Sequence, residues 1–205
     1  MKKDVHLISN GKLSALEFSH VLSSVKDDVD YFHIRERGRT SREWYEFVEY
    51  LLSKGIPAEK LVIHDRIDIA LLLGISHVQL GYNSIDVEVV KNAYPSLHVG
   101  CSVHSFAEAF EAKRKGADSI LYGHIYETKS KERLPPRGLE ELTRIVNEIG
   151  IKTVAIGGIL PKNVEAVLDS GVKGIAVMSG IIEAKDPMLT AHAYQNSIRK
   201  WEKRI

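Results

Sequence analysis

Short apolar runs recur along the whole chain at intervals of roughly 20 to 30 residues, and this recurrence limits the possible folds more than any other feature. The runs cover residues 5–8, 31–34, 61–63, 77–80, 97–99, 119–122, 153–156 and 174–177. Apolar runs this short, bounded by turn residues, are typical of buried strands. Between them lie amphipathic helical patterns, such as one face with Trp44, Phe47, Val48, Leu51 and Leu52, and another with Phe106, Ala109 and Phe110. Strand and helix therefore alternate from one end to the other.

Glycines mark the predicted ends of the helices. Gly55, Gly74, Gly116, Gly150 and Gly171 each precede the next apolar run by a few residues, as expected of left-handed residues that end a helix. Eight strand–helix units within 205 residues predict a single α/β domain over residues 1–205, a (β/α)8 TIM barrel. A doubly wound open sheet is the alternative.

The charge pattern excludes several classes of partner. The formal net charge is +1, with acidic and basic residues interleaved, so the composition supports neither nucleic-acid binding nor binding to a membrane surface. Nowhere do about 18 apolar residues follow one another, and we expect a soluble, cytoplasmic protein. The single cysteine, Cys101, lies in an apolar run and is expected to be a buried thiol rather than a nucleophile.

Two glycine-bearing segments follow the seventh and eighth predicted strands. Gly157 and Gly158 end one, and Ser179 and Gly180 follow the other. A phosphate group needs backbone N–H groups aimed at it with no Cβ in the way, and the loops after strands seven and eight form the recurrent phosphate site of this barrel. We expect the two segments to be the lips of such a site.

A long polar segment, residues 125–137, follows the sixth strand and is too long for a simple turn. We interpret it as a lid or ligand clamp, with a surface loop as the alternative. His124 lies between Gly123 and this segment, where a substrate held by the phosphate loops would project. An imidazole can take and give a proton near neutral pH, work that contributes roughly 10² to 10⁴ in rate.

Other polar residues end the second and third strands. Alternation places His33, Arg35 and Arg37 on one face, where they would bind anionic groups at the barrel mouth; an ion-pair network with Glu36 or Asp65 is the alternative for the arginines. Adjacent residues such as His64 and Asp65 point to opposite faces, so no metal site is expected, and no dinucleotide or Walker loop is present. Five histidines lie at helix or strand positions without polar companions and are set aside: His6, His20, His77, His98 and His192.

In its motifs the chain resembles the thiamin phosphate synthase superfamily over nearly its whole length. The resemblance rests on residues 33–37, 64–66, 100–104 and 123–131 and on the loops at 157–158 and 178–179, in this order. It implies the barrel fold. In the synthase, Mg²⁺ on two aspartates holds a diphosphate. The first aspartate corresponds to Asp65, but Ser84 stands where the second is expected, and a neutral hydroxyl is a weak ligand for Mg²⁺.

Gly123-His124 is similar to the signature of the thiazole tautomerase (TenI-like) branch. The resemblance implies an isomerase of thiamin biosynthesis that converts a non-aromatic ylidene thiazole carboxylate phosphate to its aromatic tautomer, with His124 moving the proton and with neither metal nor cofactor. Gly158, Met178 and Ser179 would hold the phosphate. The whole implied substrate-binding set is Arg35, Ser102, Thr128, Lys129, Ser130, Lys131, Gly158, Met178 and Ser179.

Two other functions stay open at this point. A Mg²⁺-dependent thiamin phosphate synthase is favoured by the overall similarity and by Asp65, and a regulatory protein that binds the ligand without turnover is the third hypothesis. The expected partner is a small thiazole phosphate. The sequence leaves open a homo-oligomer, the residue that contacts the substrate carboxylate, and whether residues 128–137 close as a lid.

Overall fold

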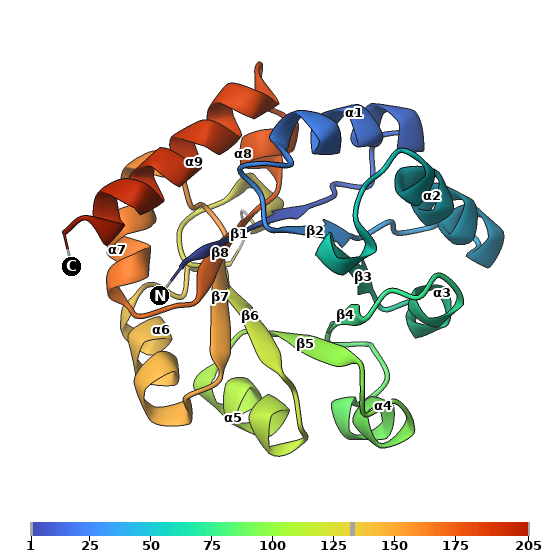
Figure 1. The fold of residues 1–205 in the computed structure, drawn as a ribbon. Coiled ribbons are helices and arrows are strands. Elements are labelled where there is room, and N and C mark those ends of the chain that lie inside the picture. Colours follow the sequence, from blue (N-terminus) through green and yellow to red (C-terminus); the bar gives the residue numbers. More distant parts are fainter. Residues whose placement is uncertain (1, 132–133, 205) are drawn as a thin grey trace.

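The protein, described by a computed structural model over residues 2–131 and 134–204, forms a closed barrel of eight parallel strands (Figure 1). Each strand pairs with its neighbour in sequence, and β8 pairs with β1, with Val5 opposite Ile175. The strands are β1 (Asp4–Ile8), β2 (Tyr31–Ile34), β3 (Leu61–His64), β4 (His77–Leu80), β5 (His98–Val103), β6 (Ser119–Gly123), β7 (Lys152–Ile156) and β8 (Gly174–Val177). The β1–β8 pairing confirms the predicted barrel over the open sheet.

Helices surround the strands, as Figure 1 shows. They are α1 (Ala15–Val25), α2 (Ser41–Ser53), α3 (Ile67–Leu72), α4 (Val87–Ala93), α5 (Phe106–Arg114), α6 (Glu140–Arg144), α7 (Val164–Asp169), α8 (Ser179–Ile182) and α9 (Pro187–Glu202). Short helical turns are η1 (Ala58–Lys60), η2 (Lys129–Lys131), η3 (Ile145–Ile149) and η4 (Pro161–Asn163). The alternation of strand and helix is therefore as predicted, with α9 as an extra helix after α8.

Local sequence explains where the helices begin and end. Ser14 and Thr40 start α1 and α2 with capping boxes, in which each hydroxyl accepts a hydrogen bond from the backbone N–H three residues on. The five glycines expected after helices all have positive φ, between 65° and 91°.

The predicted buried face of α2 is confirmed at Trp44, Phe47, Val48 and Leu51. On α5 the prediction is wrong for Phe110, whose side chain is 53% exposed. The buried stripe of α5 runs through Ala109 and Ala112, and a residue one position further along a helix is turned about 100° away. Cys101 on β5 is buried, as expected, and burial raises the pKa of its thiol to about 12.

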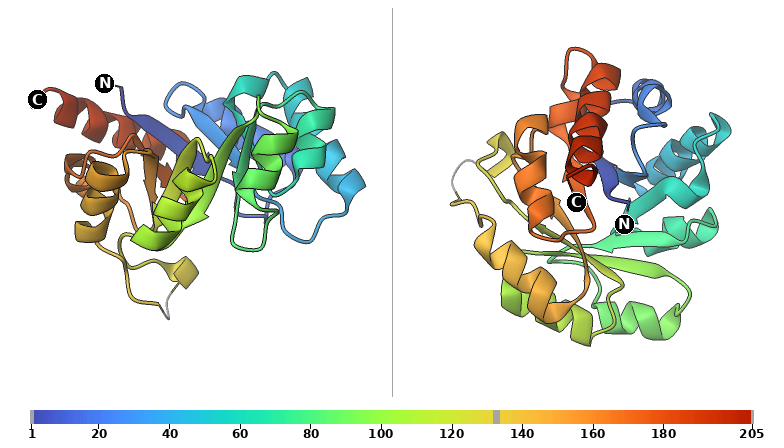
Figure 2. Two further views of the ribbon diagram at one scale, coloured as in Figure 1. Left: turned by 90° about the horizontal axis from the view of Figure 1, so that it is seen from below. Right: turned by 60° about the vertical axis from the view of Figure 1, so that its left-hand side comes forward.

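The two ends of the barrel differ in what they carry. The chain enters β1 on one face, near the C-terminal end of α9, whereas η2 projects from the opposite face (Figure 2). This second face holds the C-terminal ends of the strands, where barrels of this kind place their sites. In the part of the chain that the structure describes, no helix is long and apolar enough to cross a membrane.

Candidate active site

A cavity of about 570 Å³ opens at the C-terminal ends of the strands. The catalytic residue and the substrate-binding set implied by the resemblance all line it, from β5 and from the segments that follow β2, β6, β7 and β8. These residues are Arg35, Ser102, His124, Thr128, Lys129, Ser130, Lys131, Gly158, Met178 and Ser179. The fold thus brings the whole set around one space, while the role of each residue stays a prediction. Residues 132 and 133 of the proposed lid lie outside the described residues.

Gly157 and Gly158 form one wall of the cavity, with φ of 103° and 65°. A Cβ on Gly157 would overlap the Cβ of His124, and one on Gly158 would overlap the carbonyl oxygen of Glu127 and lie 2.7 Å from the Cβ of Tyr126. Only glycine fits both the backbone conformation and the space. The loops after β6 and β7 are therefore in direct contact.

The adjoining wall consists of Met178, Ser179 and Gly180, where β8 leads into the short α8. Helix α9 contacts this wall through Tyr194. The buried Tyr194 of α9 donates a hydrogen bond to the carbonyl oxygen of Ile159 at 2.9 Å, and a Cβ on Gly180 would lie 2.8 Å from the same hydroxyl oxygen. One tyrosine thus contacts both predicted phosphate loops.

His124 is buried, with 4% of its surface exposed, in the wall between these loops. Its backbone follows a cis peptide bond from Gly123. The Nε2 atom lies 3.1 Å from the carbonyl oxygen of Leu134, which can only accept a hydrogen bond. Nε2 is therefore assigned the proton, which leaves the lone pair on Nδ1. This tautomer leaves one ring nitrogen with a free lone pair.

The residues after His124 fix its position. The N–H of Ile125 donates to the carbonyl oxygen of Ile156 at 2.9 Å, and the N–H of Arg137 donates to the carbonyl oxygen of His124 at 2.8 Å. Both ends of the polar loop are thus hydrogen-bonded near the histidine, which ties the orientation of its ring to the conformation of the loop.

Positive charge gathers on one side of the cavity. Burial and the nearby Arg37 lower the pKa of Arg35, and burial, Arg137 and Arg35 lower the pKa of Lys131. Burial is the larger cause of both shifts, and the smaller contributions of the neighbouring arginines report a positive potential, which favours an anionic ligand. The alternative ion pair between Arg37 and Glu36 is wrong, because Glu36 pairs with Arg39 at 3.0 Å.

His33 does not join the arginines at the mouth. Its Nδ1 lies 3.0 Å from Nε2 of His64, and its Nε2 lies 2.8 Å from Nδ1 of His6, inside the barrel. Residues that share a face of a strand still differ in depth, and two residues span about 6.6 Å. The predicted position of His33 at the mouth is therefore wrong, because its side chain lies deeper in the barrel than the arginines. Burial lowers the pKa of both His33 and His64 well below the usual value.

Asp65 lies at the rim of the cavity in the left-handed region, with φ of 62°. Its carboxylate accepts a hydrogen bond from the hydroxyl of Ser84, which in turn accepts one from the N–H of Gly81 at 2.6 Å. Within the described chain, no three His, Cys, Asp or Glu side chains are placed to hold a metal ion. Asp65 thus has a neutral hydroxyl as its neighbour where the resemblance places a second aspartate, and a hydroxyl is a weak ligand for Mg²⁺, so this pair does not fit a two-aspartate magnesium site.

Sequence reasoning assigned no role to three residues that also line the cavity: Tyr82, His104 and Glu127. The Nδ1 of His104 donates to the carbonyl oxygen of Gly123 at 2.6 Å, and its Nε2 lies 3.4 Å from Nζ of Lys131. The sequence feature that could have indicated a role for His104 is its position directly after β5. Glu127 contacts the site because Gly158 packs against its backbone.

Comparisons with known proteins agree on one family. The family model described as thiamine monophosphate synthase matches residues 5–181. The thiamine-phosphate synthase of Pyrococcus furiosus is 37% identical over 186 residues, which cover 90% of this chain and 89% of that protein. The synthase of Haloarcula marismortui is 31% identical over 205 residues and covers 96% of this chain and 97% of its own.

Solved structures give the same result. The thiamine phosphate pyrophosphorylase from Pyrococcus furiosus superimposes with a TM-score of 0.83 at 30% identity, over 97% of this chain and 96% of that one. The match covers the strands, the polar loop and both glycine loops. The chain therefore belongs to the thiamine monophosphate synthase family.

Proposed function

We propose that this member of the family is a thiazole tautomerase, which converts the ylidene thiazole carboxylate phosphate of thiamin biosynthesis to its aromatic tautomer. The observation that carries the proposal is the position of His124, buried in the cavity wall between two loops suited to phosphate. Its Nε2 is held by a carbonyl oxygen, which leaves Nδ1 as a base.

The shape and charge of the cavity support one orientation of the substrate. The phosphate would bind at Gly158, Met178 and Ser179, because Gly158 exposes its backbone and Ser179 adds a hydroxyl at the start of α8. The substrate carboxylate would face the positive side of the cavity, toward Arg35 and Lys131. Ser102 and the polar residues 128–130 complete that side, and the thiazole ring then lies beside His124.

The proposed reaction moves one proton. Nδ1 of His124 removes the proton from ring carbon C2, and the electrons of that C–H bond enter the ring. The exocyclic double bond shifts into the ring, and the exocyclic carbon takes a proton from the imidazolium. The hydrogen bond from Nε2 to Leu134 strengthens while the ring is charged. Aromatisation supplies the driving force, and acid–base catalysis of this kind contributes roughly 10² to 10⁴ in rate.

The test is aromatisation of the ylidene substrate, followed by ultraviolet absorbance. His124→Gln should lower kcat by about 10² or more, while the affinity for the aromatic product stays within about threefold. His20→Gln on α1, away from the cavity, is the matched control. Unchanged turnover by the His124 variant would refute the assignment. Loss of product binding as well would point to a structural role for the ring.

A second candidate is thiamin phosphate synthase itself, and the names of the relatives favour it. Asp65 also stands where the resemblance places one of the two aspartates. Against it, Ser84 supplies only a neutral hydroxyl beside Asp65, which is a weak ligand for Mg²⁺. Formation of thiamin phosphate from the two precursors with Mg²⁺ would establish this candidate. Binding of the thiazole phosphate without turnover of either kind would favour a regulatory protein.

A further inference from the structure

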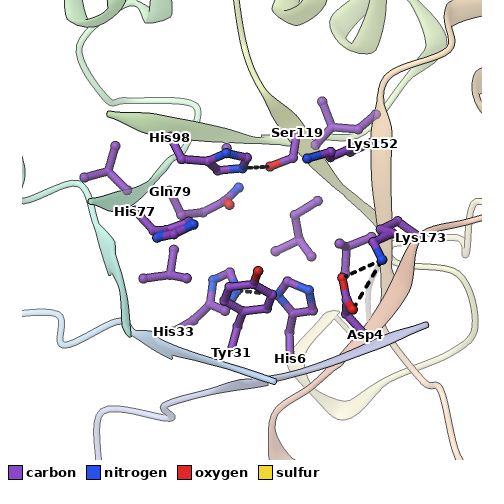
Figure 3. A pocket seen from close by; sticks show the side chains of 16 residues that line it. Asp4, His6, Tyr31, His33, His77, Gln79, His98, Ser119, Lys152 and Lys173 are labelled. Atoms are coloured by element: carbon purple, nitrogen blue, oxygen red, sulfur yellow. Dashed lines mark hydrogen bonds and ion pairs between the residues drawn. The ribbon is translucent and has the colours of Figure 1, made fainter. Parts of the chain in front are cut away.

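A second cavity, of about 160 Å³, lies at the N-terminal end of the barrel, opposite the candidate active site. Figure 3 shows polar side chains from near the start of several strands around it, and apolar residues such as Val62, Ile120 and Val154 complete the lining. Four aromatic rings follow one another along one side, and the centroids of successive rings are 4.8, 5.6 and 4.9 Å apart. These rings belong to His6, Tyr31, His77 and His98. Lys152 of β7 and the residue Lys173 before β8 face them from the other side.

This composition is unusual for its place in the fold. Branched apolar residues commonly fill the interior layers of such barrels, because a buried polar group costs free energy unless it is hydrogen-bonded. His6 uses its Nδ1 on His33, at 2.8 Å. Its Nε2 is buried, and in the described part of the chain it is the single buried side-chain nitrogen or oxygen without a hydrogen-bond partner. The unpartnered Nε2 is therefore covered by the cavity wall, so the groups that meet a ligand must come from other side chains of the lining.

The charges around the cavity favour an anion. Lys173 pairs with Asp4 at 3.3 Å, so these two charges offset each other. Lys152 has no ion pair within the described residues, and in Figure 3 its ammonium group points across the cavity toward Ser119 and His98. Asp118, which also influences this region, pairs with Lys91 at 3.0 Å. The lining thus has an excess of one positive charge.

The histidines of this wall are neutral donors. Burial, with a smaller contribution from Lys173, lowers the pKa of His6 to about 3. Burial also lowers the pKa of His77 and His98, and Lys152 lowers both further, whereas Asp118 opposes the shift. A neutral imidazole has one N–H to donate. The lysines lower these pKa values because they create a positive potential in the cavity.

We propose that this N-terminal cavity is a binding site for a compact oxyanion, such as a phosphate or carboxylate group, held by Lys152. Ser119, which already contacts His98 at 3.2 Å, and the Tyr31 hydroxyl are further donors that line the same space.

The size and ligand geometry fit this class of ligand. A cavity needs about 10–15 Å³ for one water molecule, so about 160 Å³ admits a polyatomic anion. The imidazoles do not form a ready metal site, because the described residues contain no group of three or more metal-ligating side chains with suitable placement. An ammonium group and an N–H donor are the usual partners of an oxyanion.

The test uses the full chain titrated with inorganic phosphate and, in a second series, with acetate, followed by NMR of the histidine side chains. Phosphate can also enter the candidate active site, and the two sites are distinguished by which signals move. His6, His77 and His98 report the N-terminal cavity, whereas His104 and His124 report the C-terminal one. The two titrations separate phosphate from carboxylate as the anion.

Lys152→Gln should weaken the response of His6, His77 and His98 to the anion about tenfold or more, with His104 and His124 unchanged. Lys26→Gln, an exposed lysine at the end of α1 that does not line the cavity, is the charge-matched control and should leave both responses unchanged. The proposal is overturned if neither anion shifts the three histidines in the wild type, or if the two lysine variants weaken the response equally.

Discussion

Gly158→Ala tests the contact between the loops after β6 and β7. The substitution acts in two ways that can be estimated separately. A left-handed backbone, with φ of 65°, costs a residue with a Cβ about 1–2 kcal/mol. Overlap of the new methyl group with the carbonyl oxygen of Glu127 and with Tyr126 costs about 1–3 kcal/mol more. The expected loss in the free energy of unfolding is therefore about 2–5 kcal/mol.

Gly55→Ala is the matched control, because Gly55 has φ of 80° but nothing within 4 Å of its would-be Cβ. It should lose only the backbone part, about 1–2 kcal/mol. The gain from restricting the unfolded chain is the same in both variants and cancels in their difference. Urea unfolding of both proteins measures that difference. If Gly158→Ala is no less stable than Gly55→Ala, the argument that the two loops are in contact fails.

Three further predictions concern single residues. Ser84→Asp should place a second carboxylate beside Asp65 and tighten Mg²⁺ binding about tenfold or more by calorimetry; equal affinities would contradict the interpretation of this pair. Arg35→Gln should raise KM for the ylidene substrate about tenfold with a smaller change in kcat, whereas an unchanged KM would remove Arg35 from the binding site. His6, with its pKa lowered to about 3, binds a proton in the unfolded chain but not in the barrel as the pH falls below about 6.5, so folding stability decreases on acidification over that window. Between about pH 7 and about pH 5.5, His6 accounts for about 1 kcal/mol of the loss in the free energy of unfolding. Urea unfolding of His6→Gln at these two pH values should therefore show a loss that is smaller by about 1 kcal/mol, and an unchanged loss would contradict the lowered pKa.

The sequence predicted the barrel because every strand is an apolar run followed by an amphipathic helix with a glycine at its end. This local pattern needs no knowledge of distant contacts, so the position of all eight strands could be read directly. The exposure of Phe110 could not be predicted in this way, because which face of α5 is buried depends on how the helix packs against the barrel.

The candidate site was predictable in part for a similar reason. Strand ends in a parallel barrel meet at one face, so His124, Arg35 and Ser179 could be placed together from their positions at strand ends. The hydrogen bond from His124 to Leu134 depends on the path of a long loop, which has no periodic signal. His6, His77 and His98 of the N-terminal cavity were set aside because each looks isolated in sequence, and only the closure of the barrel brings them around one space.

Tyr194 has a consequence for the synthesis of the protein. Its hydroxyl joins the loop after β7 to the start of α8, yet it lies in α9, the last helix of the chain. Because the N-terminal part of a chain leaves the ribosome first, the two predicted phosphate loops lack this support until α9 has emerged. We therefore expect nascent chains to acquire the ability to retain a phosphate ligand only after α9 has emerged and packed beneath the two loops.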